Sequence, residues 1–310
     1  MDGIGKDSRG NRMRAFAENA QEMGCEVARQ YPMSRYTSLR VGGEAELVVT
    51  PGSVAELCKL LDILSGSDIP WVVLGAGSNT VVYDGGINGV VISTTKLRNI
   101  EIREDGTVHA ETGAILGAIL NKTIKAGLTG FEFAAGIPGT VGGGVFMNAG
   151  ANGGEIKDAL TRVWVWSGGR EIEIKREDIK FEYRKSHLPA GCVITRAEFG
   201  LKPGDKEVIE KNVKEYMEKR SRTQPIKMSN TGSIFKNPPE IAAGRLIEEL
   251  GLKGYGIGGA RFSELHANFI VNAGGATASD VLSLIETAKK EAREKRGITL
   301  ETEVRIIGKK

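Results

Sequence analysis

The glycines of this chain are concentrated in two stretches, and this clustering limits what the chain can fold into. Of 42 glycines among 310 residues, 18 lie between Gly75 and Gly154 and eight between Gly244 and Gly275, whereas an average composition gives roughly 22 in all. The stretches have no every-third-residue period, and Val, Ile, Leu and Phe alternate with the glycines, which argues against collagen and against a flexible linker. The pattern predicts a folded protein whose backbone approaches something closely.

Charge and the scatter of reactive side chains argue against several classes of protein. The 42 basic and 39 acidic residues give a net charge of +3, which does not indicate a nucleic-acid-binding surface. No apolar run approaches the ~18 residues of a membrane span, and residues 1–33 carry charges throughout, unlike a secretory signal. The cysteines and histidines are few and far apart: Cys25, Cys58, Cys192, His109, His187 and His266. We therefore expect no disulfide framework, no metal site and a cytoplasmic location.

Hydrophobic periodicity predicts mixed helices and strands in the first two thirds of the chain. Ser53 followed by Glu56 is a capping-box signature, and apolar residues at helical spacing predict the helix behind it. Helices are expected at 54–64 and 115–126, and strands at 46–50, 70–74, 90–92, 107–111, 162–166, 171–174 and 193–201. Residues 12–30 have the weak patterning of a helix or a mobile arm, to which the sequence assigns no function.

The pattern changes after Pro203. Helices are expected at 208–220, 242–250 and 279–296, and the last two end at Gly251 and Gly297, where a glycine cap is common. A final strand is expected at 298–307. The resulting division is an N-terminal helical arm over residues 1–34, a first domain over 35–205 and a smaller α+β domain over 206–310.

The first glycine loop follows a predicted strand and reads Gly75-Ala76-Gly77-Ser78-Asn79. Glycines there permit positive φ, so that successive backbone N–H groups face one concavity that suits a pyrophosphate. A Rossmann fingerprint needs a third glycine where Thr80 stands and a helix after it, whereas a strand and turn follow here. Phosphate binding and an ordinary tight turn both remain open for this loop.

The second glycine loop covers residues 133–151 and is almost uncharged. Gly142, Gly143 and Gly144 are consecutive, and phenylalanines and valines flank them. Such a segment can lie flat against a planar apolar ligand while its amides supply hydrogen bonds. A tightly packed turn explains three consecutive glycines less well, because each of them loses conformational entropy on folding. The sequence favours a ligand here.

Two further segments contain candidate polar side chains. Arg184 follows the aromatic Tyr183, and by sequence alone a surface ion pair is the simpler interpretation. Ser233 follows Gly232 and precedes a Lys-Asn pair, as an exposed hydroxyl on a sharp turn can. None of the three histidines has the spacing of a nucleophile triad. A proton donor is therefore a more plausible role for Ser233 than a nucleophile.

The last predicted strand has two carboxylates on one side. Leu300, Thr302 and Val304 share one face by the period-2 rule, and Glu301 and Glu303 share the other. One carboxylate there indicates a solvated face, whereas two followed by an arginine can line a cleft. The pattern does not choose between Glu301 and Glu303.

Taken together, these segments resemble the UDP-N-acetylenolpyruvoylglucosamine reductase family, also called UDP-N-acetylmuramate dehydrogenases, of bacterial cell-wall synthesis. Eight segments match in order, at 36–43, 75–79, 136–144, 183–186, 232–238, 243–248, 266–272 and 300–304. The resemblance covers residues 36–308 and leaves out only the N-terminal 30 or so residues. The short run from Pro238 to Tyr255 resembles the compact class of the family, which lacks a substrate-covering insertion.

The resemblance implies an α+β fold. Its FAD-binding part is of the PCMH/vanillyl-alcohol-oxidase-like type, with two α/β lobes, and a smaller α+β substrate-binding domain follows it. It also implies bound FAD, NADPH as the reducing co-substrate, and a UDP-sugar enolpyruvyl ether as the small-molecule substrate; a monomer is assumed. The cofactor contacts that it implies are Gly75, Ala76, Gly77, Ser78, Asn79, Gly136, Pro138, Gly139, Thr140, Gly142, Gly143 and Asn148.

The resemblance also assigns catalytic roles. Arg184 is expected to stabilise the negative charge that develops when hydride reaches C3 of the enolpyruvyl group, and Ser233 to give a proton to C2. The glutamate of the family maps best to Glu303, which would hold or polarise the substrate carboxylate, with Glu301 in reserve. Contacts to the phosphates and sugar of the substrate are expected from Tyr183, Lys227, Lys236 and Asn237.

Two alternatives compete with this interpretation. The first is another FAD-dependent oxidase or dehydrogenase of the same cofactor-binding fold, acting on a different hydroxylated substrate. The second is a non-catalytic sensor of nucleotide sugars. Two observations separate the three hypotheses: whether the protein has the colour of a flavin, and which substrate is required for NADPH to be oxidised.

Overall fold

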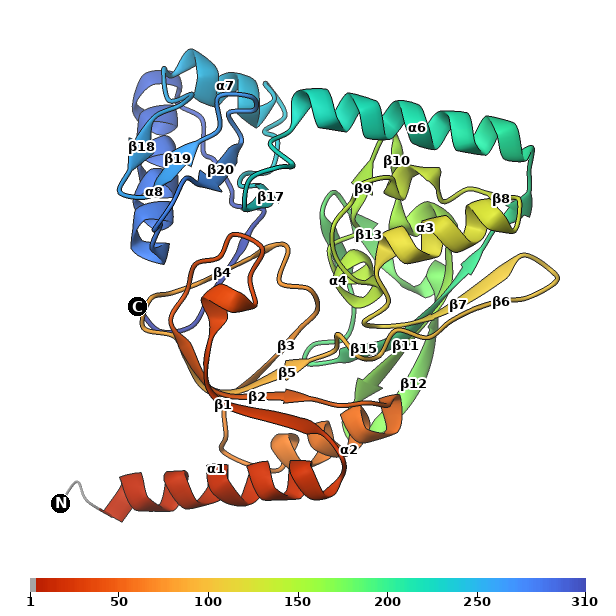
Figure 1. The fold of residues 1–310 in the computed structure, drawn as a ribbon, viewed down its shortest axis with the longest axis vertical. Helices are drawn as coiled ribbons and strands as arrows, with labels where there is room; N and C mark the ends of the chain where they lie inside the picture. Colours follow the sequence, from red (N-terminus) through yellow and green to blue (C-terminus); the bar gives the residue numbers. More distant parts are fainter. Residues whose placement is uncertain (1–3) are drawn as a thin grey trace. The chain divides into compact units, whose positions relative to one another are not determined.

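The computed structural model describes residues 4–310 and, by its internal contacts, divides the chain into two compact units (Figure 1). The first unit contains the chain up to Arg29 and the segments Glu46–Ala76 and Gly89–Met217. The second unit contains Gln30–Ala45, Gly77–Asn88 and Glu218–Lys310. The chain therefore enters the second unit twice before its C-terminal third.

This grouping differs from the division predicted at residues 34/35 and 205/206. The second unit includes the early segments because β4 (Thr80–Val82) pairs in parallel with β21 (Arg305–Ile307). Val81 is fully buried in the same hydrophobic cluster as Leu300 and Val304. The last division falls within helix α6 (Lys206–Thr223), which sequence patterning reads as one continuous element.

The first unit contains a five-stranded antiparallel sheet. Its strand order is β12-β11-β15-β7-β6. The strands run over Arg170–Lys175 (β12), Leu160–Ser167 (β11), Val193–Gly200 (β15), Thr107–Glu111 (β7) and Ile100–Ile102 (β6). In β7, Val108 and Ala110 are buried whereas His109 and Glu111 are partly exposed, which is the alternation expected of a sheet with one covered face.

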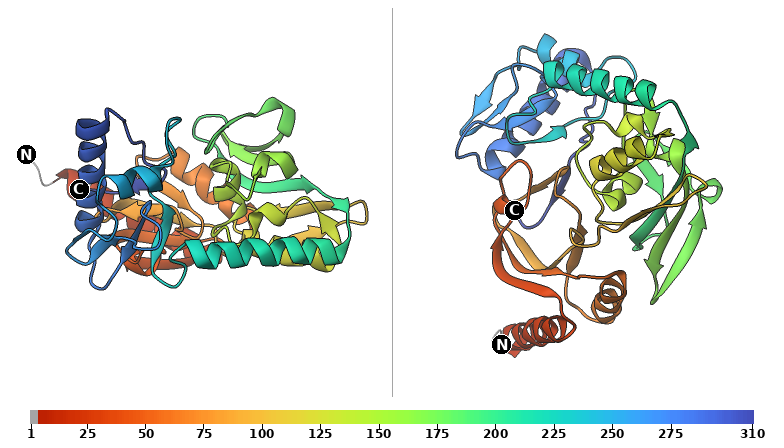
Figure 2. Two further views of the ribbon diagram at one scale, coloured as in Figure 1. Left: turned by 90° about the horizontal axis from the view of Figure 1, so that it is seen from above. Right: turned by 45° about the vertical axis from the view of Figure 1, so that its right-hand side comes forward.

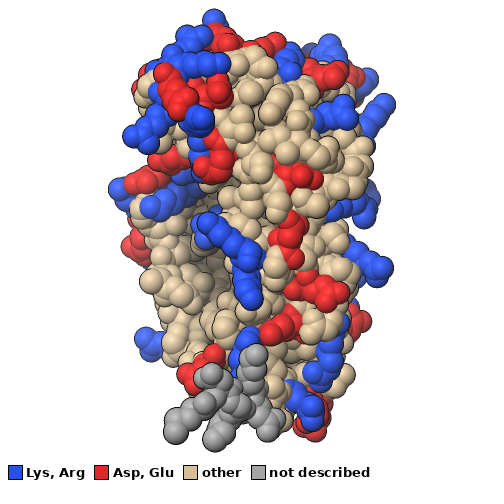
Figure 3. Space-filling model, turned by 90° about the vertical axis from the view of Figure 1, so that its left-hand side faces the viewer, with Lys and Arg blue, Asp and Glu red and all other residues tan. Residues whose placement is uncertain are grey.

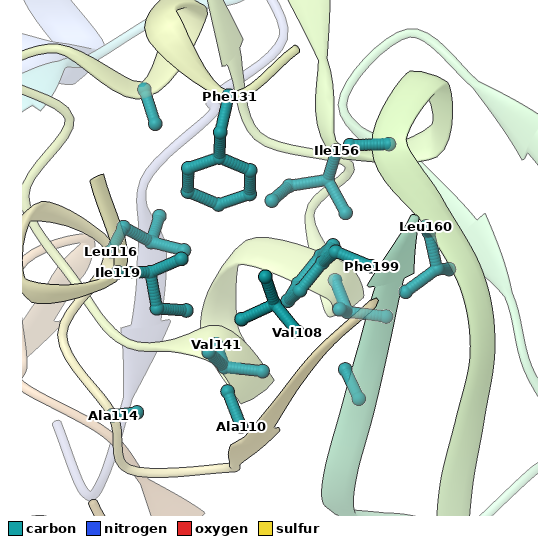
Figure 4. Packing of buried hydrophobic residues seen from close by; sticks show 14 of the residues in the cluster. Val108, Ala110, Ala114, Leu116, Ile119, Phe131, Val141, Ile156, Leu160 and Phe199 are labelled. Carbon is teal, nitrogen blue, oxygen red and sulfur yellow. The ribbon is translucent and has the colours of Figure 1, made fainter. Parts of the chain in front are cut away.

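Helices α3 (Leu116–Lys125) and α4 (Val141–Phe146) contribute to the core against this sheet. Figure 4 shows Phe131 and Phe199 near the middle of this core, and their ring centroids are 5.2 Å apart in an edge-to-face arrangement. The shorter elements of the unit are β8 (Leu128–Thr129), β9 (Gly150–Ala151), β10 (Gly154–Glu155), α5 (Ile156–Ala159), β13 (Lys180–Glu182), β14 (Lys185–His187), β16 (Lys202–Pro203) and the 3₁₀ turns Glu132–Ala134 and Arg176–Asp178.

A four-stranded sheet has the order β1-β2-β5-β3, with strands Glu26–Pro32 (β1), Glu44–Thr50 (β2), Ile87–Ser93 (β5) and Trp71–Leu74 (β3). Helix α2 (Val54–Ser65) buries Leu57, Leu60, Leu61 and Leu64 in the associated cluster. The predicted cap is confirmed, because the Ser53 side chain accepts a hydrogen bond from the Glu56 N–H.

The expectation of a helix or mobile arm over residues 12–30 is partly wrong. Helix α1 (Ile4–Glu22) ends before Gly24, whose φ is 88°, and the chain then enters β1. The helix is packed, since Phe16, Ala17 and Ala20 are buried with the leucines of α2. Residues 26–32 alone do not predict the strand, because it forms by pairing with β2, which is separated from it by residues 33–43.

The second unit packs two helices with an antiparallel sheet of order β17-β20-β19-β18. The strands are Asn230–Ser233 (β17), Phe269–Asn272 (β20), Ala260–Phe262 (β19) and Gly256–Ile257 (β18); a 3₁₀ turn covers Met33–Arg35. Helix α8 (Ala278–Arg296) packs against β18 and β19 (Figures 1 and 2). Helices α7 (Ala243–Glu249) and α8 end before Gly251 and Gly297, at φ of 76° and 67°, as predicted.

Asp84, in the turn after β4, binds the N-terminus of α8. Its carboxylate accepts hydrogen bonds from the N–H groups of Ala278 and Ser279, each at 2.8 Å, and from the Ser279 hydroxyl. Burial raises the pKa of Asp84, but the hydrogen bonds from Ser279 and Ala278 outweigh it, so the pKa lies below its usual value. This contact fixes the β4 segment to the longest helix of the unit.

The predicted strand over 298–307 is shorter than expected. Only residues 305–307 form the strand β21, and Thr302 makes a single bridge with Phe235. Leu300 and Val304 are buried, so the predicted alternation of faces holds there although the ladder does not. The backbone of residues 301–303 bonds instead to an irregular segment that follows β17.

Charged side chains of both signs are interspersed over the face that Figure 3 draws. Among the helices of residues 4–310, none combines the length and the hydropathy that crossing a bilayer requires. Within the same residues, no cluster of three or more His, Cys, Asp or Glu side chains is placed to hold a metal ion.

Candidate active site

The first glycine loop connects β3 to β4. Gly77 has a φ of 65°, and a Cβ there would lie 2.9 Å from the carbonyl oxygen of Tyr36, so a larger residue would have to displace backbone. Within residues 4–310, the N–H groups of Gly77 and Ser78 donate no hydrogen bond to the protein. Two adjacent N–H groups without an internal acceptor are a suitable binding place for phosphate oxygens.

The two glycine loops meet in the first unit. A Cβ built at Gly75 would overlap the Oγ1 atom of Thr140, so the backbone of the first loop touches the start of α4. The resemblance implied that both loops contact one bound FAD. Their proximity is consistent with that expectation, which stays a prediction.

Part of the second loop is helical, which corrects the expectation of one continuous loop. Thr140 caps α4 through its hydroxyl, and its side chain is buried. The N–H groups of Val141 and Gly142 donate to Ala114 and Thr112, at 2.9 and 2.8 Å. The N–H of Gly142, a predicted cofactor contact, is therefore committed to the fold, whereas Gly143 and the turn at 136–139 are not fully buried.

The segment 136–139 is an uncharged turn with two glycines in the left-handed region. Gly136 has a φ of 75° and Gly139 a φ of 120°, whereas Pro138 between them is exposed. An apolar turn of this kind can lie against a planar ring system, as the sequence predicted.

Gly142→Ala is expected to destabilise the protein by about 1–3 kcal/mol, because its methyl group would overlap the buried hydroxyl of Thr112. Gly143→Ala is the matched control in the same helix. Gly143 is exposed, and its Cβ would meet only Thr140 Oγ1, at 3.7 Å. This variant should be neutral, or up to about 1 kcal/mol more stable because alanine favours the helix. Urea unfolding measures both; equal losses would contradict the packing role of Gly142.

Asn148 is placed differently from the prediction. Its side chain is completely buried, and its Nδ2 donates to Glu155 Oε2 at 3.0 Å and to the Glu182 carbonyl at 3.2 Å. Its Oδ1 accepts from the N–H of Lys157 at 3.1 Å. All these partners belong to the protein, and the prediction that Asn148 contacts a cofactor stays a prediction.

The hairpin of β13 and β14 carries Arg184 in its turn. Glu182 pairs with Lys185 at the end of the ladder, so Tyr183 and Arg184 form a two-residue connection. Hydrogen bonds from Lys180 and then from His187 lower the pKa of Glu182 to about 2, which keeps this carboxylate ionised.

Arg184 has a φ of 57°, a left-handed conformation that is uncommon for a residue with a side chain. Its Nη2 donates to the Gly150 carbonyl at 2.9 Å, and its guanidinium carbon lies 4.9 Å from the ring centroid of Tyr183. Tyr183 is 46% exposed. A strained backbone that holds a cation beside an exposed aromatic ring is typical of a functional position.

Ser233 ends β17 after a glycine turn. Gly232 has a φ of 75°, and its N–H donates to Oδ1 of Asn230 at 2.9 Å. Ile234 and Phe235 behind it are fully buried. In the described part of the chain, the hydroxyl of Ser233 has no hydrogen-bond partner, so it can donate to a ligand.

The structure brings Ser233 and Glu303 together through one residue. The N–H of Glu303 donates to the carbonyl of Ile234, the neighbour of Ser233, at 2.8 Å. The Glu303 carbonyl accepts from Asn79 Nδ2 at 3.1 Å. Hydrogen bonds thus connect Asn79 of the first glycine loop to Glu303, and Glu303 to the residue after Ser233, within the second unit.

The two candidate glutamates differ in their surroundings. The Glu301 side chain is 71% exposed, and its Oε2 accepts from Lys236 Nζ at 3.1 Å. Glu303 is partly buried. The structure therefore favours Glu303 as the residue that faces a ligand.

The predicted substrate-binding residues differ in whether their side chains already have partners in the protein. Lys236 is paired with Glu301, and the Asn237 side-chain oxygen accepts from the Ala243 N–H at the start of α7. Lys227 is exposed. A substrate would have to compete with Glu301 for Lys236.

Asn268 is a structural residue of the site to which the sequence assigned no role. It is 3% exposed, its Nδ2 donates to the Phe235 carbonyl and its Oδ1 accepts from the Phe235 N–H. This bidentate contact fixes the backbone two residues after Ser233. The sequence signal was an amide directly before the apolar run 269–271, since buried polar groups need partners.

A cavity of about 330 Å³ lies elsewhere, on the outer face of the five-stranded sheet. It is lined by Asn99, Glu101, Arg103, His109, Ala110, Glu111, Trp164 and Arg196. Arg196 pairs with Glu171 and Arg103 with Glu101. The cavity contains none of the predicted site residues.

Comparison with known proteins adds a family relationship to this geometry. Residues 45–171 match the model of an FAD binding domain, and residues 224–307 match the C-terminal domain of UDP-N-acetylenolpyruvoylglucosamine reductase. A relative with the reductase name, from Caldanaerobacter subterraneus subsp. tengcongensis, is 45% identical over 281 residues, which are 90% of this chain and 93% of that one. Another, from Streptococcus pneumoniae, is 44% identical over 92% of this chain and 95% of that one.

A solved structure agrees with the sequence comparison. The crystal structure of the UDP-N-acetylenolpyruvylglucosamine reductase from Thermus caldophilus superposes with a TM-score of 0.79 at 38% identity. The match covers 91% of this chain and 98% of that chain. The likeness therefore extends over both units.

Proposed function

The chain belongs to the UDP-N-acetylenolpyruvoylglucosamine reductase family, and on that premise we propose that it uses NADPH and bound FAD to reduce the enolpyruvyl group of UDP-N-acetylglucosamine enolpyruvate. The product would be UDP-N-acetylmuramate, a precursor of peptidoglycan. The proposal is supported by relatives at 44–45% identity over nine tenths of the chain. A cytoplasmic location and a monomeric state stay predictions.

The cofactor-binding role is supported by the two glycine loops. The N–H groups of Gly77 and Ser78 would hold the pyrophosphate, and the uncharged turn at 136–139 would lie against the ring system. FAD, when bound and reduced, supplies the hydride that adds to C3 of the enolpyruvyl group. Ala76, Asn79 and Gly143 remain proposed neighbours of the cofactor.

Arg184 would stabilise the charge that follows hydride addition. The electron pair of the C2–C3 double bond moves toward C2 and the adjoining carboxylate as the new C3–H bond forms. A guanidinium fixed by the Gly150 carbonyl and the Tyr183 ring can face that charge without reorganising in the transition state.

Ser233 would then complete the reduction by giving its proton to C2. A serine hydroxyl is a weak acid in water, but an enolate of a carboxylate is a strong base, so the transfer is feasible. Glu303 would hold the substrate carboxylate, with a shared proton between the two acids because like charges cannot otherwise lie close together. Tyr183, Lys227, Lys236 and Asn237 are proposed contacts to the sugar and phosphates.

One observation carries the proposal. The carbonyl of Ile234 accepts a hydrogen bond from the N–H of Glu303, and Ile234 directly follows Ser233. The buried residue Ile234 therefore connects the residue with the proposed proton-donating hydroxyl to the residue with the proposed carboxylate. An oxidase of alcohols needs a base for the substrate proton, whereas this pair supplies a proton donor and a carboxylate.

Visible spectroscopy under anaerobic conditions tests the function. The purified protein should be yellow, lose its flavin absorption with NADPH, and regain it with one equivalent of the enolpyruvyl sugar nucleotide. A colourless protein that takes up no FAD would overturn the enzyme hypothesis. Oxygen consumption with simple alcohols or sugars, without a response to the nucleotide, would favour the oxidase alternative.

A further inference from the structure

Hydrogen bonds connect the last residue of α4 and the segment after it to the hairpin that carries Arg184. The Phe146 carbonyl accepts from the Ser186 hydroxyl at 2.9 Å, and the Gly150 carbonyl accepts from Arg184 Nη2 at 2.9 Å. Between them, Asn148 Nδ2 donates to the carbonyl of Glu182 at 3.2 Å. Alternate residues of one segment therefore contact both strands of the hairpin and its turn.

Asn148 is the buried member of this set, and its orientation is determined by its partners. The N–H of Lys157 can only donate, so it fixes the side-chain oxygen of Asn148 on its side. Both amide hydrogens then face acceptors, one on Glu155 and one on Glu182. The Asn148 side chain is completely buried, and the backbone of Asn148 has a φ of 42°. The fold therefore accepts backbone strain to keep an amide at this position.

The backbone atom that Asn148 holds lies two residues from the guanidinium that the proposed reaction needs. Glu182 ends β13, and the turn residues Tyr183 and Arg184 follow it directly. Arg184 is itself left-handed, with a φ of 57°, and such a conformation persists only where surrounding contacts determine it. Without the bond from Asn148, the Glu182 carbonyl at the entry to this turn loses the hydrogen bond that connects it to the segment after α4.

We propose that Asn148 is a positioning residue that sets the Arg184 hairpin, and with it the guanidinium, in the orientation required for reduction of the substrate. The proposal rests on the proposed function for the role of Arg184. It gives the Asn148 side chain a role that the expected cofactor contact did not include. Its action is indirect, through Glu182 and the hairpin turn.

Asn148→Gly is the test variant, because glycine adopts positive φ freely and removes the amide without adding strain. Asn152→Gly is the matched control, since Asn152 is also left-handed, with a φ of 54°, and its Nδ2 reaches only the Phe133 carbonyl, at 3.5 Å. We expect Asn148→Gly to slow the oxidation of reduced enzyme by the enolpyruvyl nucleotide about 10- to 100-fold, as small misplacements of a catalytic group do. Flavin content and reduction by NADPH should match those of Asn152→Gly.

Hydrogen exchange of the purified enzyme provides a readout that does not depend on turnover. The amides of residues 182–187 should exchange faster in Asn148→Gly than in wild type and in Asn152→Gly. Unchanged exchange at these amides would overturn the positioning role. If the wild-type protein does not reduce the nucleotide, the proposed function fails, and hydrogen exchange still decides whether Asn148 orders the hairpin.

A double-mutant cycle identifies the residue through which Asn148 acts. In an Arg184→Ala background, Asn148→Gly should change the rate of oxidation by less than about twofold. A full additional loss would show a general structural effect and overturn the proposal. Loss of FAD in proportion to the lost rate would restore the cofactor-contact interpretation instead.

A compensating pair separates the two donors of Asn148. Asn148→Asp places a carboxylate beside Glu155, and adding Glu155→Gln restores a hydrogen bond between residues 148 and 155 but supplies no donor to the Glu182 carbonyl. The double variant should regain thermal stability and stay slow. Recovery of the rate would show that the bond to residue 155 is sufficient and would contradict the proposed route.

Discussion

Ser233→Ala is expected to slow the oxidation of reduced enzyme by the enolpyruvyl nucleotide by about 10²- to 10⁴-fold, the usual loss for a general acid. Reduction by NADPH should remain within about threefold of wild type, because that step requires no proton at C2 of the substrate. The turn should keep its shape, since the Gly232 N–H bond to Asn230 and the bidentate Asn268 contact to Phe235 involve no Ser233 side-chain atom. Stopped-flow absorbance of the two half-reactions measures both rates.

Ser233→Cys is the matched control for this prediction. A thiol has nearly the same shape and still carries a proton, so part of the lost rate should return. If both half-reactions of Ser233→Ala slow together, the hydroxyl is structural rather than a proton donor. Equal rates for Ser233→Ala and wild type would exclude a proton-donating role.

Glu303→Gln is expected to slow the same half-reaction by about 10²- to 10³-fold, as the loss of a preorganised electrostatic contact does. Glutamine keeps the size of the side chain but carries no charge and cannot share a proton with the substrate carboxylate. The backbone should stay in place, because the Glu303 N–H bonds to Ile234 and its carbonyl to Asn79. Single-turnover kinetics with NADPH-reduced enzyme provide the measurement.

Glu301→Gln is the control, two residues earlier in the same segment. Its carboxylate is 71% exposed and paired with Lys236, and an exposed ion pair contributes about 0–1 kcal/mol. We expect the rate of oxidation to change less than about fivefold and KM for the nucleotide to change modestly, through Lys236. A larger loss for Glu301→Gln than for Glu303→Gln would reverse the assignment of the two residues.

Local sequence chemistry predicted many of the longer helices and strands. The capping pair at Ser53 and Glu56, the glycine ends of α7 and α8, and the alternation in β7 all depend on residues close together in the chain. Each of these features is decided within about one turn of helix or one strand, where side-chain spacing and allowed φ values suffice. Short motifs also identified the two glycine loops, and the resemblance that these motifs carry identified the candidate site residues.

Contacts between distant segments decided what the sequence left open or predicted incorrectly. Residues 26–32 became a strand by joining a sheet, and the predicted strand at 298–307 shortened because its backbone bonds to the Ile234 segment. The sequence left the partners of the Asn148 side chain open, and in the structure these partners lie seven or more residues away in the chain and the side chain is completely buried. Sequence spacing contains no information on such pairings.

By itself, the sequence determined the family of the chain, the positions of the two glycine loops and the identity of Arg184 and Ser233 as candidates, because these depend on residue type and order. Only the tertiary structure showed that Glu303 is partly buried whereas Glu301 is exposed and paired with Lys236, since both residues occupy the same face by period. The structure also distinguished the glycines of the two loops. Within residues 4–310 the N–H groups of Gly77 and Ser78 donate to no protein acceptor, whereas Gly142 packs on Thr112. The physical reason is that burial and hydrogen bonding arise from residues far apart in the chain, which the fold alone brings together.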